Sequence, residues 1–118
     1  MKDYDFFPGE GKFYKANLHC HTVISDGKLT KEQIKEEYQK RGYSIVAFTD
    51  HRTYGYHPEL TDENFIALAG IEVDVSENPE KRGGWPHAKC YHLNFYDEHP
   101  EEGKEFPLPA YAYEDMAG

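Results

Sequence analysis

A chain of 118 residues with a net charge of −9 and a pI near 5.2 is expected to form one domain around a modest core. The acidic charge argues against a nucleic-acid backbone or an anionic membrane as a standing partner, and no apolar stretch reaches the ~20 residues of a membrane span. Two cysteines and an N-terminus without a charged start and apolar core lead us to expect a cytoplasmic location.

The N-terminal part of the chain predicts a strand followed by a helix. Residues 1–11 contain proline and glycine and are expected to form an arm, and the first strand is expected over residues 12–19. Thr30 and Gln33 have the spacing of a capping box, which predicts a helix over residues 31–41.

A second strand is expected soon after this helix. Gly42 is a typical residue at a helix end, and residues 44–49 form a continuous apolar run. Such a run is typical of a parallel strand that is buried on both faces. Strand, helix and strand within about 35 residues predict a βαβ unit.

The C-terminal half predicts two more strands and long connections. A single helical turn is expected at residues 61–64, and strands are expected over residues 65–75 and 91–96. Residues 76–87 read as an exposed loop or hairpin, and residues 98–118 as an acidic tail that contains proline. The motif-bearing core of the single domain would then span residues 12–97.

A histidine pair follows the first predicted strand in the run His19-Cys20-His21. Because side chains alternate along a strand, His19 and His21 should face the same way, while Cys20 should pack behind them as a small apolar residue. Two imidazoles with this spacing suit one cation, but the same pattern is common among structural histidines. The pair alone leaves both interpretations open.

Acidic residues stand next to two further turns or strand ends. Asp26 precedes Gly27, so it is either a turn residue or a ligand. Asp50 and His51 end the buried apolar run, and in α/β sheets ligands bind at the carboxyl ends of such strands. Asp50 would either orient a histidine from behind the ligands or cap the next segment, and we favour the first role.

The later strands add a carboxylate and another imidazole. Glu72 follows a buried run, where a carboxylate is costly unless it is paired or bound to a cation, and it could bridge two metals. His92 lies within the fourth predicted strand, and after three ligand-type clusters we expect it to be a ligand as well. Asp74 is two residues beyond Glu72, and we do not assign it as a ligand. Three histidines next to proline are not expected to take part: His57, His87 and His99.

Together these motifs resemble the PHP (polymerase and histidinol phosphatase) superfamily over about residues 12–97. The matching segments are Asn17-Leu18-His19-Cys20-His21-Thr22, Ser25-Asp26-Gly27, Thr49-Asp50-His51, Gly70-Ile71-Glu72 and Tyr91-His92-Leu93. The resemblance implies an α/β fold, a partial and distorted PHP-type (β/α)7 barrel with about four strands, truncated relative to the family. It also implies a centre of two to three zinc, manganese or iron ions that hydrolyses phosphoesters.

The resemblance assigns one or more metals to each candidate ligand. His19, His21 and Glu72 would bind one metal, and Glu72 would bridge to a second metal held by His92. Asp26 and His51 would belong to the third metal, as the remaining ligands of the six. A metal-bound hydroxide would then attack phosphorus while the other cations neutralise the phosphate oxygens.

The chain departs from the family in its last part, where residues 98–118 contain only one histidine, His99, for the family's later ligands, which are a further histidine and a late Asp-x-His pair. About four strands would leave an open barrel edge, which a homo-oligomer or a strand-swapped dimer would cover. Arg52, beside His51, is a candidate phosphate contact, with a plain surface position as its alternative.

Two functions therefore stay open at the level of sequence. The first is a metal-dependent phosphoesterase, with a small phosphorylated substrate favoured over nucleic acid. The second is a degenerate PHP-like module that binds metal or a phosphorylated ligand without efficient catalysis. A small structural domain with incidental histidines fits the four motifs least well.

Overall fold

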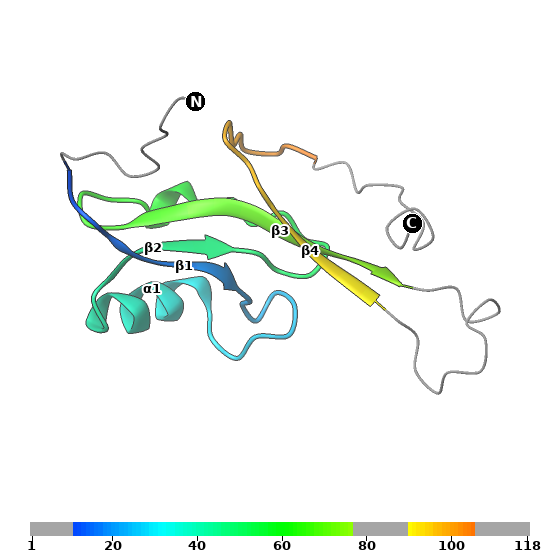
Figure 1. Cartoon of the computed structure of the whole chain (residues 1–118), viewed down its shortest axis with the longest axis horizontal. Coiled ribbons are helices and arrows are strands. Elements are labelled where there is room, and N and C mark those ends of the chain that lie inside the picture. The colour runs from blue at the N-terminus through cyan, green and yellow to red at the C-terminus, as the bar shows by residue number, and fades with distance from the viewer. Residues whose placement is uncertain (1–10, 77–89, 106–118) are drawn as a thin grey trace, which may run out of the picture.

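The computed structural model describes residues 11–76 and 90–105 (Figure 1). In chain order the elements are β1 (Lys15–Cys20), α1 (Lys31–Lys40), β2 (Tyr43–Phe48), the 3-10 helix η1 (Pro58–Leu60), β3 (Ile66–Ser76) and β4 (Cys90–Tyr96). Parts of three sequence predictions lie outside the described residues: the arm over 1–10, the loop over 77–87 and the tail over 106–118. Within the described ranges, no helix is long and apolar enough to cross a bilayer.

The four strands form one sheet in the order β1-β2-β3-β4, and α1 covers one of its faces (Figure 1). The pairs β1–β2 and β2–β3 are parallel, so the predicted βαβ unit is confirmed. The pair β3–β4 is antiparallel. The fold is therefore a mixed α/β fold in which only the first three strands are parallel.

Helix α1 begins and ends where the sequence predicts. The Thr30 hydroxyl accepts a hydrogen bond from the Gln33 amide at 3.2 Å, and the Gln33 side chain accepts one from the Thr30 amide at 3.0 Å. After the last turn, Gly42 has a φ of +83°, a left-handed conformation that favours glycine, and its amide donates to the Gln39 carbonyl. These local contacts fix both helix ends.

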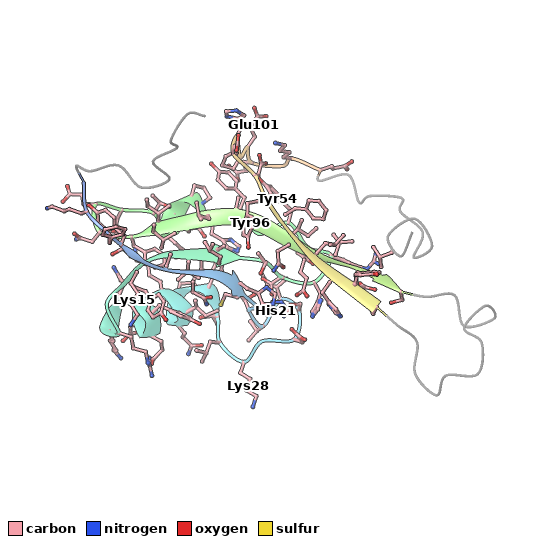
Figure 2. All side chains as sticks on the ribbon, viewed as in Figure 1. Lys15, His21, Lys28, Tyr54, Tyr96 and Glu101 are labelled. Carbon is pink, nitrogen blue, oxygen red and sulfur yellow. The ribbon has the colours of Figure 1, made fainter. Side chains whose placement is uncertain are left out.

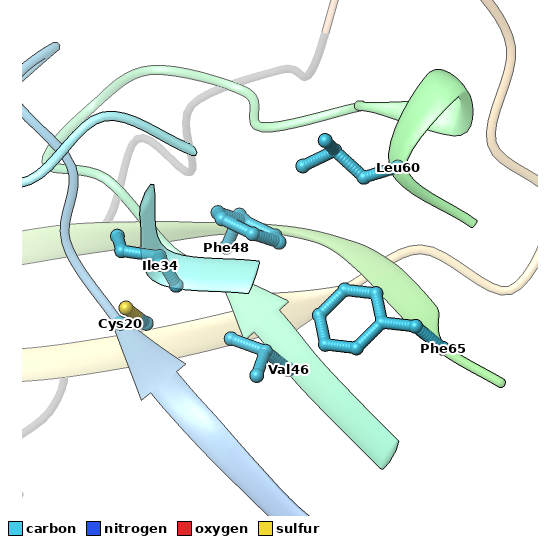
Figure 3. Close-up of a cluster of buried hydrophobic side chains, with 6 residues drawn as sticks. All are labelled: Cys20, Ile34, Val46, Phe48, Leu60 and Phe65. Atoms are coloured by element: carbon cyan, nitrogen blue, oxygen red, sulfur yellow. The ribbon is translucent and has the colours of Figure 1, made fainter. Parts of the chain in front are cut away.

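The core lies between α1 and the sheet (Figure 3). Its buried members are Cys20, Ile34, Val46, Phe48, Leu60 and Phe65. Cys20 packs in this cluster as a small apolar residue, as predicted, and burial together with the nearby Asp50 charge raises the pKa of its thiol to about 11. The side chains of this cluster hold the strands under the helix and so support the carboxyl ends of the strands.

The prediction of a helical turn at residues 61–64 is wrong. The helical turn lies earlier, in η1, where Pro58 supplies a favourable first residue. Asp62 instead accepts a hydrogen bond from the Asn64 amide at 2.8 Å, and its own amide donates to the Phe65 carbonyl at 2.9 Å. This side-chain contact to the backbone two residues ahead stabilises a tight turn that leads directly into β3.

The sheet curls into a half-barrel. The Tyr96 hydroxyl at the end of β4 donates a hydrogen bond of 2.6 Å to the Leu18 carbonyl in β1, although these are the two outer strands. In a flat sheet, strands separated by three spacings lie ~14 Å apart. The contact therefore requires the sheet to bend so that its outer strands approach each other.

Candidate metal centre

The structure brings all six predicted ligands together near the carboxyl ends of β1 and β2, where Figure 2 labels His21. They are His19 at the end of β1, His21 and Asp26 in the loop that follows, His51 after β2, Glu72 in β3 and His92 in β4. They form three overlapping groups, each with ligand atoms within 4.8 Å of one another: His19-His21-Glu72, His21-Asp26-His51 and His51-Glu72-His92. Two of these groups share Glu72, as expected for a bridging carboxylate.

Glu72 lies at the middle of this cluster and is only 4 % exposed. The backbone after β2 runs alongside it: the Glu72 amide donates to the Asp50 carbonyl at 3.2 Å, and the Arg52 amide donates to the Glu72 carbonyl at 2.8 Å. This pairing sets His51 beside Glu72. From the other side, His92 Nδ1 lies 2.8 Å from Glu72 Oε1.

Two buried polar atoms of the cluster have no hydrogen-bond partner among the described residues, His21 Nε2 and Glu72 Oε2. These two atoms are in direct contact with each other. Buried polar atoms are normally paired, and an imidazole lone pair against a carboxylate oxygen is unfavourable unless a cation or a proton lies between them. Imidazole and carboxylate donors suit zinc, manganese and iron, so the residues fit a metal centre.

His21 also contacts Asp26 at 2.6 Å through its other ring nitrogen, and Asp26 reaches His51 at 3.2 Å. Burial lowers the pKa of His21, but the hydrogen bond with Asp26 and the charges of Glu72 and Asp26 outweigh it and raise this pKa overall. The hydrogen bond with His21 is the main cause of a lowered pKa at Asp26. The imidazole thus stands between two carboxylates, an arrangement that favours positive charge.

A β-bulge in β1 shapes the histidine pair. Asn17 pairs with Val46 and Cys20 pairs with Phe48, so β1 uses three steps where β2 uses two. A bulge re-aims side chains, and β1 itself ends at Cys20. His19 and His21 therefore lie together, as strict alternation along a strand predicts. The bulge rather than a regular strand sets the directions of the two imidazoles.

Asp50 does not contact a histidine through a hydrogen bond within the described residues. Its fully buried carboxylate accepts bonds from the Thr22 amide at 2.7 Å, the Thr22 hydroxyl at 2.8 Å and the Ser25 hydroxyl at 2.7 Å. The favoured prediction, that Asp50 orients a histidine, is therefore wrong for these bonds. The alternative is wrong as well, because none of the bonds caps the segment after Asp50. Asp50 instead fixes the loop between His21 and Asp26.

Arg52 stands next to His51 with a half-exposed side chain. Its φ of +50° lies in the left-handed region, which is uncommon for a residue other than glycine. Its guanidinium donates to the Asp74 carboxylate at 2.8 Å and to the Asp74 carbonyl at 2.9 Å. Arg52 is therefore pinned to the edge of β3 beside the cluster rather than extended into solvent.

Sequence reasoning gave no role to two residues that shape this region, Thr49 and Gly27. Thr49 is fully buried, and its hydroxyl lies 2.9 Å from His19 Nδ1. Gly27 is required by close packing, because a Cβ there would lie 2.2 Å from the His21 carbonyl oxygen. A threonine that interrupts an apolar run just before Asp50-His51 was the available signal for the first.

The remaining histidines take no part in the three groups within the described residues. His57 is buried edge-on against Phe48 in the core, with ring centroids 5.1 Å apart. His99 is exposed just after β4, and its amide donates to Asp97. His87 lies outside the described residues.

Comparison with known proteins gives one family match and several partial relatives. A family model described as "PHP domain" matches residues 17–107. The "5'-3' exoribonuclease" of Haemophilus influenzae is 34 % identical over 93 residues, which cover 74 % of this chain and 31 % of that protein. The "DNA polymerase/3'-5' exonuclease PolX" of Bacillus subtilis is 32 % identical over 79 residues, or 52 % of this chain and 14 % of that protein.

A third relative is the "Phosphoribosyl 1,2-cyclic phosphate 1,2-diphosphodiesterase" of Eggerthella lenta. It is 46 % identical over 37 residues, or 31 % of this chain and 14 % of that protein. The chain thus spans at most 31 % of the length of the relatives that it matches.

Proposed function

Because the chain belongs to the PHP domain family, whose relatives named here are phosphodiesterases and exonucleases, we propose that it is a metal-dependent phosphoesterase. The observation that carries this proposal is the set of three overlapping ligand groups around the buried Glu72. A carboxylate at this position can belong to two cation sites at once, which a phosphoester-hydrolysing centre with several cations needs.

Two to three cations would be held by these groups, one to each group if the centre is complete. Zinc, manganese and iron all suit mixed imidazole and carboxylate donors. Bound cations of this kind supply an activated water and neutralise the phosphate oxygens. Glu72 would tie neighbouring sites together, and Asp50 would hold the loop that carries Asp26 in place.

Arg52 would contact the phosphate of the substrate. Asp74 fixes the guanidinium at the same edge of the sheet as His51. The positive charge of Arg52 is therefore held in one place beside the centre. An arginine in this setting offers N–H donors in a rigid fork that matches phosphate oxygens.

The substrate that we propose is a small phosphorylated molecule rather than nucleic acid, since the net charge of −9 disfavours a long polyanion. The sheet would be part of a distorted (β/α)7 barrel. Its outer strands β1 and β4 would be covered by a second copy, in a homo-oligomer or a strand-swapped dimer. The low cysteine content supports the cytoplasm as the proposed location.

Metal content and hydrolysis of an aryl phosphate with added manganese, measured on the same preparation, test the proposal. We expect at least two metals per chain and a rate that is lost in both His19→Ala and Glu72→Ala. His99→Ala is the matched control, because it removes an exposed histidine outside the cluster. A metal-loaded chain without any rate would favour the binding module instead. A chain that holds no metal would refute the phosphoesterase and leave only a module that binds a phosphorylated ligand.

A further inference from the structure

Thr49 lies directly after β2, fully buried, with its hydroxyl against the ring of His19. We propose that Thr49 is a positioning residue for the metal centre, which holds the His19 imidazole with its hydrogen on Nδ1 and its Nε2 lone pair toward Glu72. The inference deepens the proposed function, because it concerns a ligand of the same centre. It does not depend on any particular substrate.

The contacts of the Thr49 hydroxyl select this arrangement. The Cys20 amide donates to Thr49 Oγ1 at 3.1 Å, the Cys20 carbonyl lies 3.4 Å away, and His19 Nδ1 lies 2.9 Å away. A hydroxyl has one hydrogen to donate and two lone pairs to accept with. If the hydrogen goes to the Cys20 carbonyl, both lone pairs are used, one by the Cys20 amide and one by Nδ1–H of His19.

The opposite arrangement uses the hydroxyl less well. If Thr49 donated to Nδ1, the ring hydrogen would sit on Nε2, which lies 3.6 Å from Glu72 Oε2 and outside hydrogen-bond distance. One lone pair of the Thr49 hydroxyl would then have no donor, and Nε2 could not bind a cation. The tautomer with hydrogen on Nδ1 satisfies more groups and leaves the ring ready to act as a ligand.

Thr49 can restrain the ring because Thr49 itself cannot move. It has a branched Cβ with few allowed rotamers, and its backbone amide donates to the Cys20 carbonyl at 2.9 Å. Its methyl group lies 3.0 Å from the point where a Cβ on Gly70 would be, so glycine at position 70 makes room for it. By contrast, 49 % of the His19 side chain is exposed, so packing alone does not fix that ring.

Nitrogen-15 NMR of the His19 ring in the metal-free protein tests the inference before any variant is made. We expect the hydrogen on Nδ1, and a hydrogen on Nε2 in the neutral ring would overturn the proposal. This measurement needs neither metal nor activity. A failure of the metal centre and a failure of this inference are therefore distinguishable.

Three variants then separate positioning from packing. Thr49→Val keeps the shape, removes the hydroxyl, and is expected to lose the preference for Nδ1–H and about 10- to 100-fold in Zn²⁺ affinity, measured by competition with a chelator. Thr49→Ser restores the hydroxyl and should recover both properties. Thr61→Val is the matched control, since the Thr61 hydroxyl also accepts a backbone amide, that of Ala67, but Thr61 lies outside the three ligand groups and the loop that Asp50 holds. Its His19 ring should keep the hydrogen on Nδ1.

Either of two results with these variants would overturn the proposal. One is a Thr49→Val protein with unchanged His19 tautomer and Zn²⁺ affinity. The other is a Thr49→Ser protein that loses as much as Thr49→Val, because the hydroxyl would then not be the group that matters.

Discussion

Glu72→Gln is expected to remove most of the stability that the protein gains from metal. The substitution keeps the shape of a side chain that is 4 % exposed but removes its charge. Four imidazoles approach this carboxylate: those of His19, His21, His51 and His92. Because two of the three ligand groups include Glu72, loss of its charge should weaken both.

The size of the effect follows from linkage between binding and folding. A cation at 100 times its dissociation constant stabilises the folded state by about 2.7 kcal/mol per site. One kcal/mol shifts the melting temperature of a 60- to 100-residue domain by about 4–8 °C, so each bound zinc should raise the melting temperature of the unaltered protein by roughly 11–22 °C. Metal-free Glu72→Gln should melt within a few degrees of the unaltered protein, since an amide oxygen can still accept from His92 Nδ1.

Scanning calorimetry with and without Zn²⁺ measures this difference directly. Glu63→Gln is the matched control, because it makes the same change at an exposed position and should keep the full shift. If Glu72→Gln showed the same zinc-induced shift as the unaltered protein, Glu72 would not be a shared ligand and the reasoning would be refuted.

Three further predictions concern groups around the core. Alkylation of the native protein at pH 8 should label exposed Cys90 but not Cys20, whose burial raises its pKa to about 11, and equal labelling by mass spectrometry would contradict the core assignment. Asp50→Ala should lower the free energy of unfolding in urea by about 3–5 kcal/mol, because two buried donors and one partly buried donor lose a charged acceptor, and a loss below about 1 kcal/mol would contradict this. Burial lowers the pKa of His57, so the unfolded chain takes up this proton first and stability should fall as the pH drops below about 6.5. His57→Leu should make that fall shallower, and an unchanged slope would show that other groups cause it.

Features set by local sequence were predictable. The capping pair of Thr30 and Gln33 defines the start of α1 through contacts only three residues apart. The apolar run before Asp50 predicted a parallel strand, and the carboxyl ends of parallel strands meet at one edge of a sheet. That geometry is why residues as distant in sequence as His19 and Glu72 could be expected together.

Features that depend on contacts between distant segments were not predictable. The extra residue in β1 is visible only against its partner β2, and the antiparallel direction of β4 only against β3. The position of Asp50 before His51 predicts a residue that orients a ligand. Its three hydrogen-bond donors nevertheless come from residues 22 and 25, and no local sequence pattern connects these residues with Asp50. One local feature was missed as well: a turn at residues 62–65 stands in place of the expected helical turn, because the side chain of Asp62 offers the Asn64 amide an alternative partner.

The hydrogen bond between Tyr96 and Leu18 also has a consequence for the order of folding. It joins groups 78 residues apart, and the entropy lost on closing a loop grows with its length. Closure of β4 against β1 is therefore expected to be a late event, after the local βαβ unit and the β3–β4 pair have formed. His19 lies in β1 and His92 in β4, so the six candidate ligands come together fully only when this closure takes place. Metal should accordingly slow unfolding much more than it accelerates folding, because the complete binding site forms only in the native state.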